Sequence, residues 1–348
     1  MRIRRTFPII FAVLVIAAAV TVAVELRKNA PPEAARLLPG GDAFFYVNLG
    51  RIRHFAGAKE LPAVSHDAEY DAFIRETGFH FERDLDEAAF TIHYPASGGS
   101  RTPVSPTPRF SEVFVGKFDA TRLASYLKQH ATSIDNYESV DIFSIPIEDR
   151  TFRVAIIGAD SAAASNSDDP AVIRGIVDRS RRLASPFGGP ALLRRYYKRV
   201  QFASPVWLIA HLDPSSPQFG HWSDLLPSSA DIVISAGYNP LHLPLHQAPI
   251  HLRAEAFTSS ADNARSLGER LNTYLAMFHA AETSAGTSGT DPDVKAAFDS
   301  LQIKEEDDRT VLTAVIPPGF FKKLFSETPP GPVPSTPSSA QPPTATKQ

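Results

Sequence analysis

Apolar residues follow two different periods in this chain, and segments of each period alternate along it. Short runs rich in β-branched and aromatic residues, such as AFFYVN and VWLIAHL, are typical of strands. Between them, apolar residues recur every three or four positions, as in amphipathic helices. The predicted strands are 43–48, 88–94, 112–118, 141–147, 152–157, 206–212, 231–238, 251–257, 301–305 and 311–316. The predicted helices are 66–77, 120–132, 170–183, 191–200, 261–281 and 320–325, with a helical turn near 223.

Short polar links between neighbouring strands determine the fold class. Glu148 to Thr151 (EDRT) separates two predicted strands, and Asp307 to Thr310 (DDRT) separates two others. Such links suit tight hairpins, because Asp tolerates positive φ and bonds its own backbone. A parallel crossover needs about a dozen residues or more. We therefore predict an α+β fold with largely antiparallel sheets, helices on one face, and mobile loops at 95–109, 158–169 and 282–293.

The order of elements occurs twice, which predicts a duplication of a β-α-β-β-α-β-β unit. The matching EDRT and DDRT links support it, as do the capping residues that follow Phe118 and Phe257, each before a predicted helix. The predicted organisation has a first α+β repeat at 31–200 and a second at 201–328. Residues 329–348 hold seven prolines with few apolar residues, so we predict a disordered tail.

Residues 1–30 have the features of an export element. Three arginines precede the apolar run 7–24, which has 18 residues. As a helix it would extend about 27 Å, close to the ~30 Å hydrocarbon core of a bilayer. We predict a single-pass membrane anchor with a cytoplasmic stub, the rest of the chain being periplasmic or on the cell surface. A signal peptide cut near Ala17 to Ala19 is the alternative.

Composition and motifs exclude several classes of protein. The chain has no cysteine, so it has no disulfide, thiolate metal site or thiol nucleophile. Residues 31–328 carry 29 basic and 37 acidic side chains, unlike a nucleic-acid-binding protein. Common nucleotide-binding, zinc-protease, EF-hand and serine-hydrolase motifs are absent. We therefore predict no cofactor, no metal and no catalytic residue, and we favour a binding protein over an enzyme.

The histidines are the residues that could support metal binding or hydrolysis. His242, His246 and His251 lie close in sequence, but Pro244 and Pro249 prevent a helix from bringing them together, so we interpret them as loop histidines. A second set would give an envelope hydrolase with a His/Asp site. Its members are His211, Asp213, His221 and Asp224.

Basic residues are concentrated between 174 and 199, where eight of them accompany one acid, Asp178. Within 191–200, apolar residues recur at helical spacing with basic residues at their flanks, which predicts a basic amphipathic helix. We predict that this stretch binds an anionic lipid, a glycan or an acidic protein; an ordinary surface helix with solvated arginines is the alternative. The predicted binding residues are Arg181, Arg182, Arg194, Arg195, Lys198 and Arg199.

Three segments mark entries into strands and helices: LLPGGD from Leu37, GKFD from Gly116 and SDDPAVIR from Ser167. With the apolar run 7–24, they resemble uncharacterised single-pass bacterial envelope proteins that have an α+β ectodomain. The resemblance covers residues 36–200 and implies a location but no activity. The resulting hypothesis is a membrane-tethered extracytoplasmic binding or assembly module of the cell envelope. The alternatives are the hydrolase above and a carrier of an apolar ligand.

Overall fold

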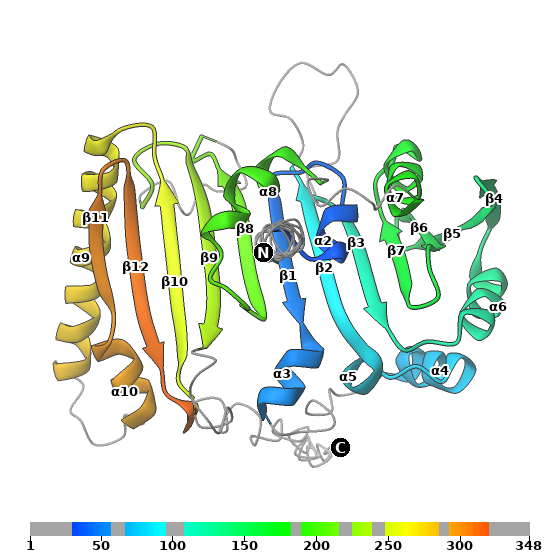
Figure 1. Ribbon diagram of the computed structural model, residues 1–348, viewed down its shortest axis with the longest axis horizontal. Coiled ribbons are helices and arrows are strands. Elements are labelled where there is room, and N and C mark those ends of the chain that lie inside the picture. Colours follow the sequence, from blue (N-terminus) through cyan, green and yellow to red (C-terminus); the bar gives the residue numbers. More distant parts are fainter. Residues whose placement is uncertain are drawn as a thin grey trace, which may run out of the picture.

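The computed structural model describes residues 30–56, 67–94, 108–181, 189–215, 225–238, 248–284 and 292–319. Within them, twelve strands form one sheet, and every pairing is antiparallel (Figure 1). The sheet order is β11-β12-β10-β9-β8-β1-β2-β3-β7-β6-β5-β4. The strands are β1 (Ala43–Asn48), β2 (Leu85–His93), β3 (Arg109–Gly116), β4 (Ser133–Tyr137), β5 (Val140–Ile147), β6 (Arg150–Ile156), β7 (Ser161–Ser165), β8 (Val206–Leu212), β9 (Ala230–Tyr238), β10 (Ile250–Phe257), β11 (Gln302–Glu306) and β12 (Arg309–Ile316). The predicted α+β class with a large antiparallel sheet is confirmed.

Helices precede, connect and follow these strands. They are α2 (Glu33–Leu37), α3 (Leu49–Ala56), α4 (Ala68–Thr77), α5 (Phe81–Asp84), α6 (Ala120–His130), α7 (Ala171–Arg181), α8 (Ala191–Tyr196), the 3₁₀ turn η1 (Tyr197–Arg199), α9 (Ala261–Ser284) and α10 (Pro292–Asp299). Strands β1 and β8 pair at the middle of the sheet, so residues from both predicted repeats belong to one sheet.

Successive side chains of a strand point to opposite faces of the sheet, which gives this sheet two distinct faces. We call the face that carries Phe44 and Trp207 the front face and the face that carries Phe45 and Leu208 the back face. The front face holds the largest buried cluster, in which β1, β3, β8 and β9 pack against α2, α7 and α8. Figure 1 shows these three helices in front of the sheet.

The back face is covered at its ends. Helix α9 packs there through Leu267, and the hydroxyl of Thr310 on β12 donates to the carbonyl of Ala264, at 2.7 Å. Towards the other end, Phe73 and Phe79 pack with Phe90 and Phe114. The expectation that helices cover one face is therefore wrong. Helix α9 follows β10 and returns over the back face, whereas α7 and α8, which lie between β7 and β8, cross the front face.

Two strands were not predicted, β4 and β7. Strand β7 has the sequence SAAAS and lies in a segment that we expected to be a mobile loop. Ser and Ala have low strand propensity, so nothing local marks it. It forms because β3 and β6 pair with it on either side, and Ala163 is fully buried between them. Tertiary packing has overridden local preference here.

The two polar links form tight hairpins, as predicted. Glu148 and Asp307 have φ of 55° and 50°, and the strands pair directly across each link, Ile147 with Arg150 and Glu306 with Arg309. The duplication itself stays a prediction. In the described residues, the four strands β4 to β7 lie between α6 and α7, whereas only the two strands β11 and β12 follow α9.

Several predictions fall on residues outside the described ranges. They concern the anchor 7–24, the tail 329–348, the helical turn near 223 and the helix 320–325. Among the residues that the structure describes, no helix is both long and apolar enough to cross a bilayer. The anchor therefore remains a prediction from the sequence.

Asp119 caps helix α6, and its removal gives a first testable prediction. Its Oδ1 accepts hydrogen bonds from the backbone N–H groups of Thr121 and Arg122, at 2.9 and 3.0 Å. We expect Asp119→Ala to lower the free energy of unfolding by about 1 kcal/mol, because those two donors lose their partner. Urea denaturation followed by circular dichroism measures the change. Asp119→Ser should retain most of the stability; equal losses in both variants would contradict a capping role.

Candidate functional site

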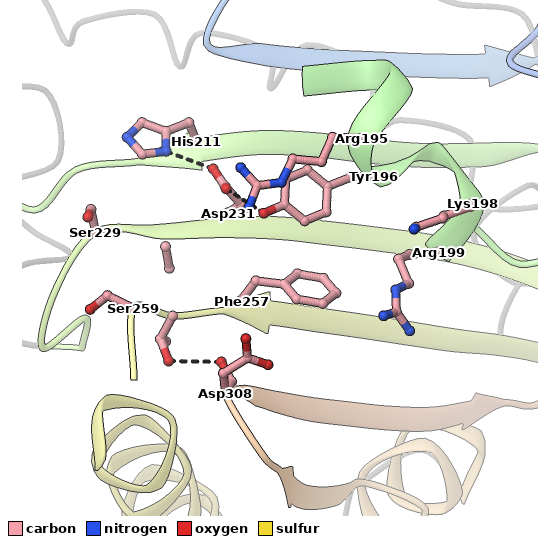
Figure 2. A pocket seen from close by; sticks show the side chains of 12 residues that line it. Arg195, Tyr196, Lys198, Arg199, His211, Ser229, Asp231, Phe257, Ser259 and Asp308 are labelled. Carbon is pink, nitrogen blue, oxygen red and sulfur yellow. Dashed lines mark hydrogen bonds and ion pairs between the residues drawn. The ribbon is translucent and has the colours of Figure 1, made fainter. Parts of the chain in front are cut away.

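A groove of about 370 Å³ lies on the front face, between α8–η1 and the adjoining parts of β8, β9 and β10 (Figure 2). Segments far apart in the sequence contribute to it. Its lining consists of cations, aromatic rings, hydroxyls and two carboxylates. The lining residues are Arg195, Tyr196, Lys198, Arg199, His211, Ser229, Ala230, Asp231, Phe257, Thr258, Ser259 and Asp308.

Helix α8 forms one wall because its apolar side packs on the sheet. Leu193 is fully buried, and the ring of Tyr196 lies 5.0 Å from that of Phe257 on β10. Tyr197, in η1, meets Trp207 edge to face at 5.5 Å. The predicted basic amphipathic helix is thus present, although it ends at Tyr196 and tightens into the 3₁₀ turn η1.

Two basic side chains of this wall, Arg195 and Arg199, have aromatic neighbours in place of acidic partners. The guanidinium of Arg195 lies 5.1 Å from the ring centre of Tyr196, and that of Arg199 lies 5.4 Å from the ring centre of Phe257. No carboxylate of the described residues forms an ion pair with Arg194, Arg195, Lys198 or Arg199 within 4.0 Å. Cation–π contacts position a charge without neutralising it. This wall therefore presents positive charge that is available to a ligand.

Asp231 organises the opposite part of the groove. Its Oδ2 accepts a hydrogen bond from the Tyr196 hydroxyl at 2.6 Å, and its Oδ1 lies 2.7 Å from Nδ1 of His211. Burial, followed by the contact with Asp231, raises the pKa of Tyr196 to about 12. Tyr196 therefore stays protonated as a donor at neutral pH. Because both carboxylate oxygens are occupied, Asp231 positions its neighbours; Asp308 supplies the second carboxylate of the groove.

The predicted binding residues separate into two places. Arg195, Lys198 and Arg199 line the groove, and Arg194 precedes them on α8. Arg181 ends α7 and pairs with Glu138 at 3.6 Å, so it belongs elsewhere. Arg182 lies outside the described residues. The six residues predicted from their proximity in sequence are therefore not one site, because α7 and α8 pack over different strands.

The two described members of the His/Asp hydrolase set, His211 and Asp213, each have a partner outside that set. The acidic partner of His211 is Asp231, which was not in the set. Asp213 instead accepts from the backbone N–H and hydroxyl of Ser215, which lower the pKa of its carboxyl. His221 and Asp224 lie outside the described residues.

The part of the chain that the structure describes contains no cluster of side chains suited to a metal ion. No group of three or more His, Asp or Glu side chains there is arranged to hold a metal ion. His251 lies exposed on β10, and His242 and His246 are outside the described ranges.

The features above define a large antiparallel sheet protein with a cationic, aromatic groove on its front face. No family model matches the chain, and no curated protein matches it. Among solved structures, three crystal forms of TP0453 align with TM-scores of 0.41, 0.39 and 0.40. The aligned residues are 10%, 11% and 10% identical and cover 84–85% of this chain and 97–98% of TP0453. Similarity at this level assigns neither a family nor a function.

Proposed function

We propose that this chain is a non-catalytic binding module of the cell envelope, tethered by residues 7–24, and that the front groove binds a phosphate-bearing glycan. The observation that carries the proposal is the row of Arg195, Lys198 and Arg199 along one wall, without acidic partners among the described residues. Arginine and lysine side chains directed at one open groove suit phosphate oxygens.

The rest of the lining favours a glycan over a lipid headgroup. Ser229, Thr258 and Ser259 offer hydroxyls, Asp308 offers a carboxylate, and Phe257 offers a ring. Sugar hydroxyls can form hydrogen bonds with these protein hydroxyls and with the carboxylate of Asp308. The ring of Phe257 can pack against the apolar face of a sugar. The volume of about 370 Å³ lies at the lower end of the ~300–1,000 Å³ range of small-molecule sites.

Removal of the three cations tests this proposal. We expect the triple variant Arg195→Ser, Lys198→Ser, Arg199→Ser to weaken binding of glucose 6-phosphate by at least about tenfold, because the loss of even one charge-assisted bond of about 1.5 kcal/mol changes the affinity by that factor. Titration calorimetry at low and high salt measures the dissociation constant. Glucose and inorganic phosphate, each of which is one part of the ligand, are titrated for comparison.

A charge-matched control separates the groove from general attraction. Lys117, Lys128 and Arg265 are exposed away from the groove, and their replacement by Ser removes the same net charge. This control should bind like the wild type. Equal weakening in both triple variants, or binding to anionic vesicles with no response to glucose 6-phosphate, would reject the glycan site.

The duplication forms a second part of the proposal, and the sheet order supports it. From the central pair β1 and β8, the strands β1-β2-β3 and β8-β9-β10 run outward in opposite directions. A helix follows the third strand in each case, and a later strand returns to pair with that third strand: β7 with β3, and β12 with β10. We infer two related halves, with the hairpin β4–β5 additional in the first. In this correspondence β6–β7 matches β11–β12. The EDRT link, between β5 and β6, and the DDRT link, between β11 and β12, are then not equivalent, so the sheet order carries this inference without them.

A further inference from the structure

Asp308 is the carboxylate of the front groove that has no partner among the described residues. It is exposed in the turn between β11 and β12 and lines the groove. No cation of the described residues lies within 4.0 Å of its carboxylate. The other carboxylate of the groove, Asp231, is already bonded to Tyr196 and His211, at 2.6 and 2.7 Å. Asp308 is therefore the acid that a ligand can reach.

The backbone around Asp308 holds it in place at the groove. Asp307 has a φ of 50°, which closes the tight hairpin between β11 and β12. The main-chain carbonyl of Asp308 accepts from the backbone N–H and from the hydroxyl of Thr258, each at 2.9 Å. Figure 2 shows Asp308 on the other side of the Phe257 ring from Tyr196. The hairpin and the contact with Thr258 thus fix the main chain from which this carboxylate projects.

The neighbouring arginine does not neutralise Asp308. The guanidinium of Arg309 is bonded to Glu306 and donates to the buried Glu255 at 3.2 Å. Its charge acts on Asp308 only at longer range, without an ion pair. Because Arg309 serves two other carboxylates, the negative charge of Asp308 remains available at the groove.

The groove therefore carries unpaired charge of both signs. Arg195, Lys198 and Arg199 supply positive charge, and Asp308 supplies negative charge. A ligand that is only an anion would be repelled by Asp308, whereas a ligand with a phosphate and an ammonium group would pair with both. We propose that the ligand of the groove is a phosphorylated amino sugar, with its phosphate on the three cations and its ammonium group on Asp308. This inference rests on the glycan site proposed above and names the class of its ligand.

Titration calorimetry of the full chain at about pH 6.5, where a sugar amine is protonated, compares four small ligands. Glucosamine 6-phosphate should bind about fivefold more tightly than glucose 6-phosphate, because it adds a charge-assisted contact at a partly solvated site. N-acetylglucosamine 6-phosphate, whose nitrogen carries no charge, should show no such gain. Phosphoethanolamine has both charges but no sugar ring to pack on Phe257, so it should bind more weakly than glucosamine 6-phosphate.

The variant Asp308→Asn tests the assigned residue, because it keeps the size of the side chain and removes its charge. It should bind glucosamine 6-phosphate and glucose 6-phosphate equally. It should also bind inorganic phosphate about twofold more tightly than the wild type does, because a repulsive charge is gone. A variant with a damaged fold would lose affinity for every ligand, so this gain separates the two causes.

The matched control is Asp149→Asn, which removes the same charge from the corresponding position of the β5–β6 hairpin. That hairpin also has a residue with positive φ before the aspartate, Glu148 at 55°. Asp149 is 83% exposed, and its neighbour Arg150 lies 3.8 Å away. Because β5 and β12 lie near opposite ends of the sheet, this variant should keep the wild-type affinities for all ligands.

Three results would overturn the assignment of an amino sugar. They are equal wild-type affinities for glucosamine 6-phosphate and glucose 6-phosphate, a preference that persists in Asp308→Asn, and phosphoethanolamine binding as tight as that of glucosamine 6-phosphate. In each case, glucose 6-phosphate binding that is lost in the triple cation variant would leave the glycan site standing. Absence of binding by all the phosphorylated ligands would reject the glycan site itself, and the amino sugar with it.

Discussion

Replacement of Trp207 by alanine should lower the free energy of unfolding by about 4 kcal/mol, within the usual range for a fully buried large aromatic side chain. Trp207 is 1% exposed and lies on β8 at the middle of the front face. Its ring stacks on Tyr46 of β1 at 5.3 Å and meets Tyr197 of η1 at 5.5 Å. Removing the indole leaves a cavity between the two central strands and the turn that completes the groove wall.

Urea denaturation measures this loss, and two variants interpret it. Trp207→Phe should cost about 1.5 kcal/mol or less, because it keeps an aromatic ring and removes an indole Nε1 that has no hydrogen-bond partner in the described residues. Met277→Ala, on the exposed side of α9, should change stability by about 0.5 kcal/mol or less. A Trp207→Ala loss near that of Met277→Ala would show that the central pair contributes little.

Trp207 also links stability to the groove. Tyr197 rests on Trp207, and the neighbouring Lys198 and Arg199 belong to the same 3₁₀ turn. Loss of the indole should therefore weaken glucose 6-phosphate binding in protein that remains folded, although Trp207 does not line the groove. Titration of Trp207→Phe, which retains the ring contact, provides the comparison.

The sequence was sufficient for the fold class and for most strands, because their apolar runs and hairpin links are local signals. It was insufficient for β4 and β7, whose residues carry no such signal. SAAAS becomes a strand because β3 and β6 offer unpaired edges on both sides, a property of the assembled sheet. Among the described strands, Ser133–Tyr137 pairs only with β5 and is largely exposed, so its polar composition gives no strand signal.

The sequence predicted one wall of the candidate site, the wall formed by α8. Basic residues at the flanks of an apolar stripe indicated α8, and three of them line the groove. The contribution of Asp231, Phe257 and Asp308 was not predictable, because β9, β10 and the β11–β12 turn meet α8 only in the folded sheet. The pairing of His211 with Asp231 in place of Asp213 has the same cause, since both residues of the pair face front on adjacent strands.

The apolar back face shows why local periodicity also missed a surface. Strands such as VWLIAHL and DIVISAGY carry apolar residues on both faces, as buried strands do. Periodicity in one strand cannot tell which face the helices will cover. Only the register between strands aligns Phe45, Leu208 and Ile234, of which Phe45 is exposed and the other two are partly buried.

Removal of Arg309, one of the two cationic partners of the buried Glu255, should also lower the free energy of unfolding strongly. Glu255 on β10 is 3% exposed, and its two oxygens accept from Arg253 at 2.7 Å and from Arg309 at 3.2 Å. Arg309 also bonds Glu306, which raises the pKa of the guanidinium further, so it is permanently charged. We expect Arg309→Met to lower the free energy of unfolding by about 3 kcal/mol at neutral pH, because Glu255 keeps a buried charge with one partner.

The double variant Glu255→Met, Arg309→Met separates this cause from lost packing. Replacing both charges by apolar side chains of similar length should recover most of the stability, since a buried ion pair roughly balances its own desolvation. Arg265→Met is the matched single control, because Arg265 pairs with Asp262 on the exposed surface of α9 and should cost about 0.5 kcal/mol or less. Urea midpoints of the three variants provide the measurement. If the double variant is no more stable than Arg309→Met, the loss arises from the arginine stem packed near Phe257, and the unpaired carboxylate is not its cause.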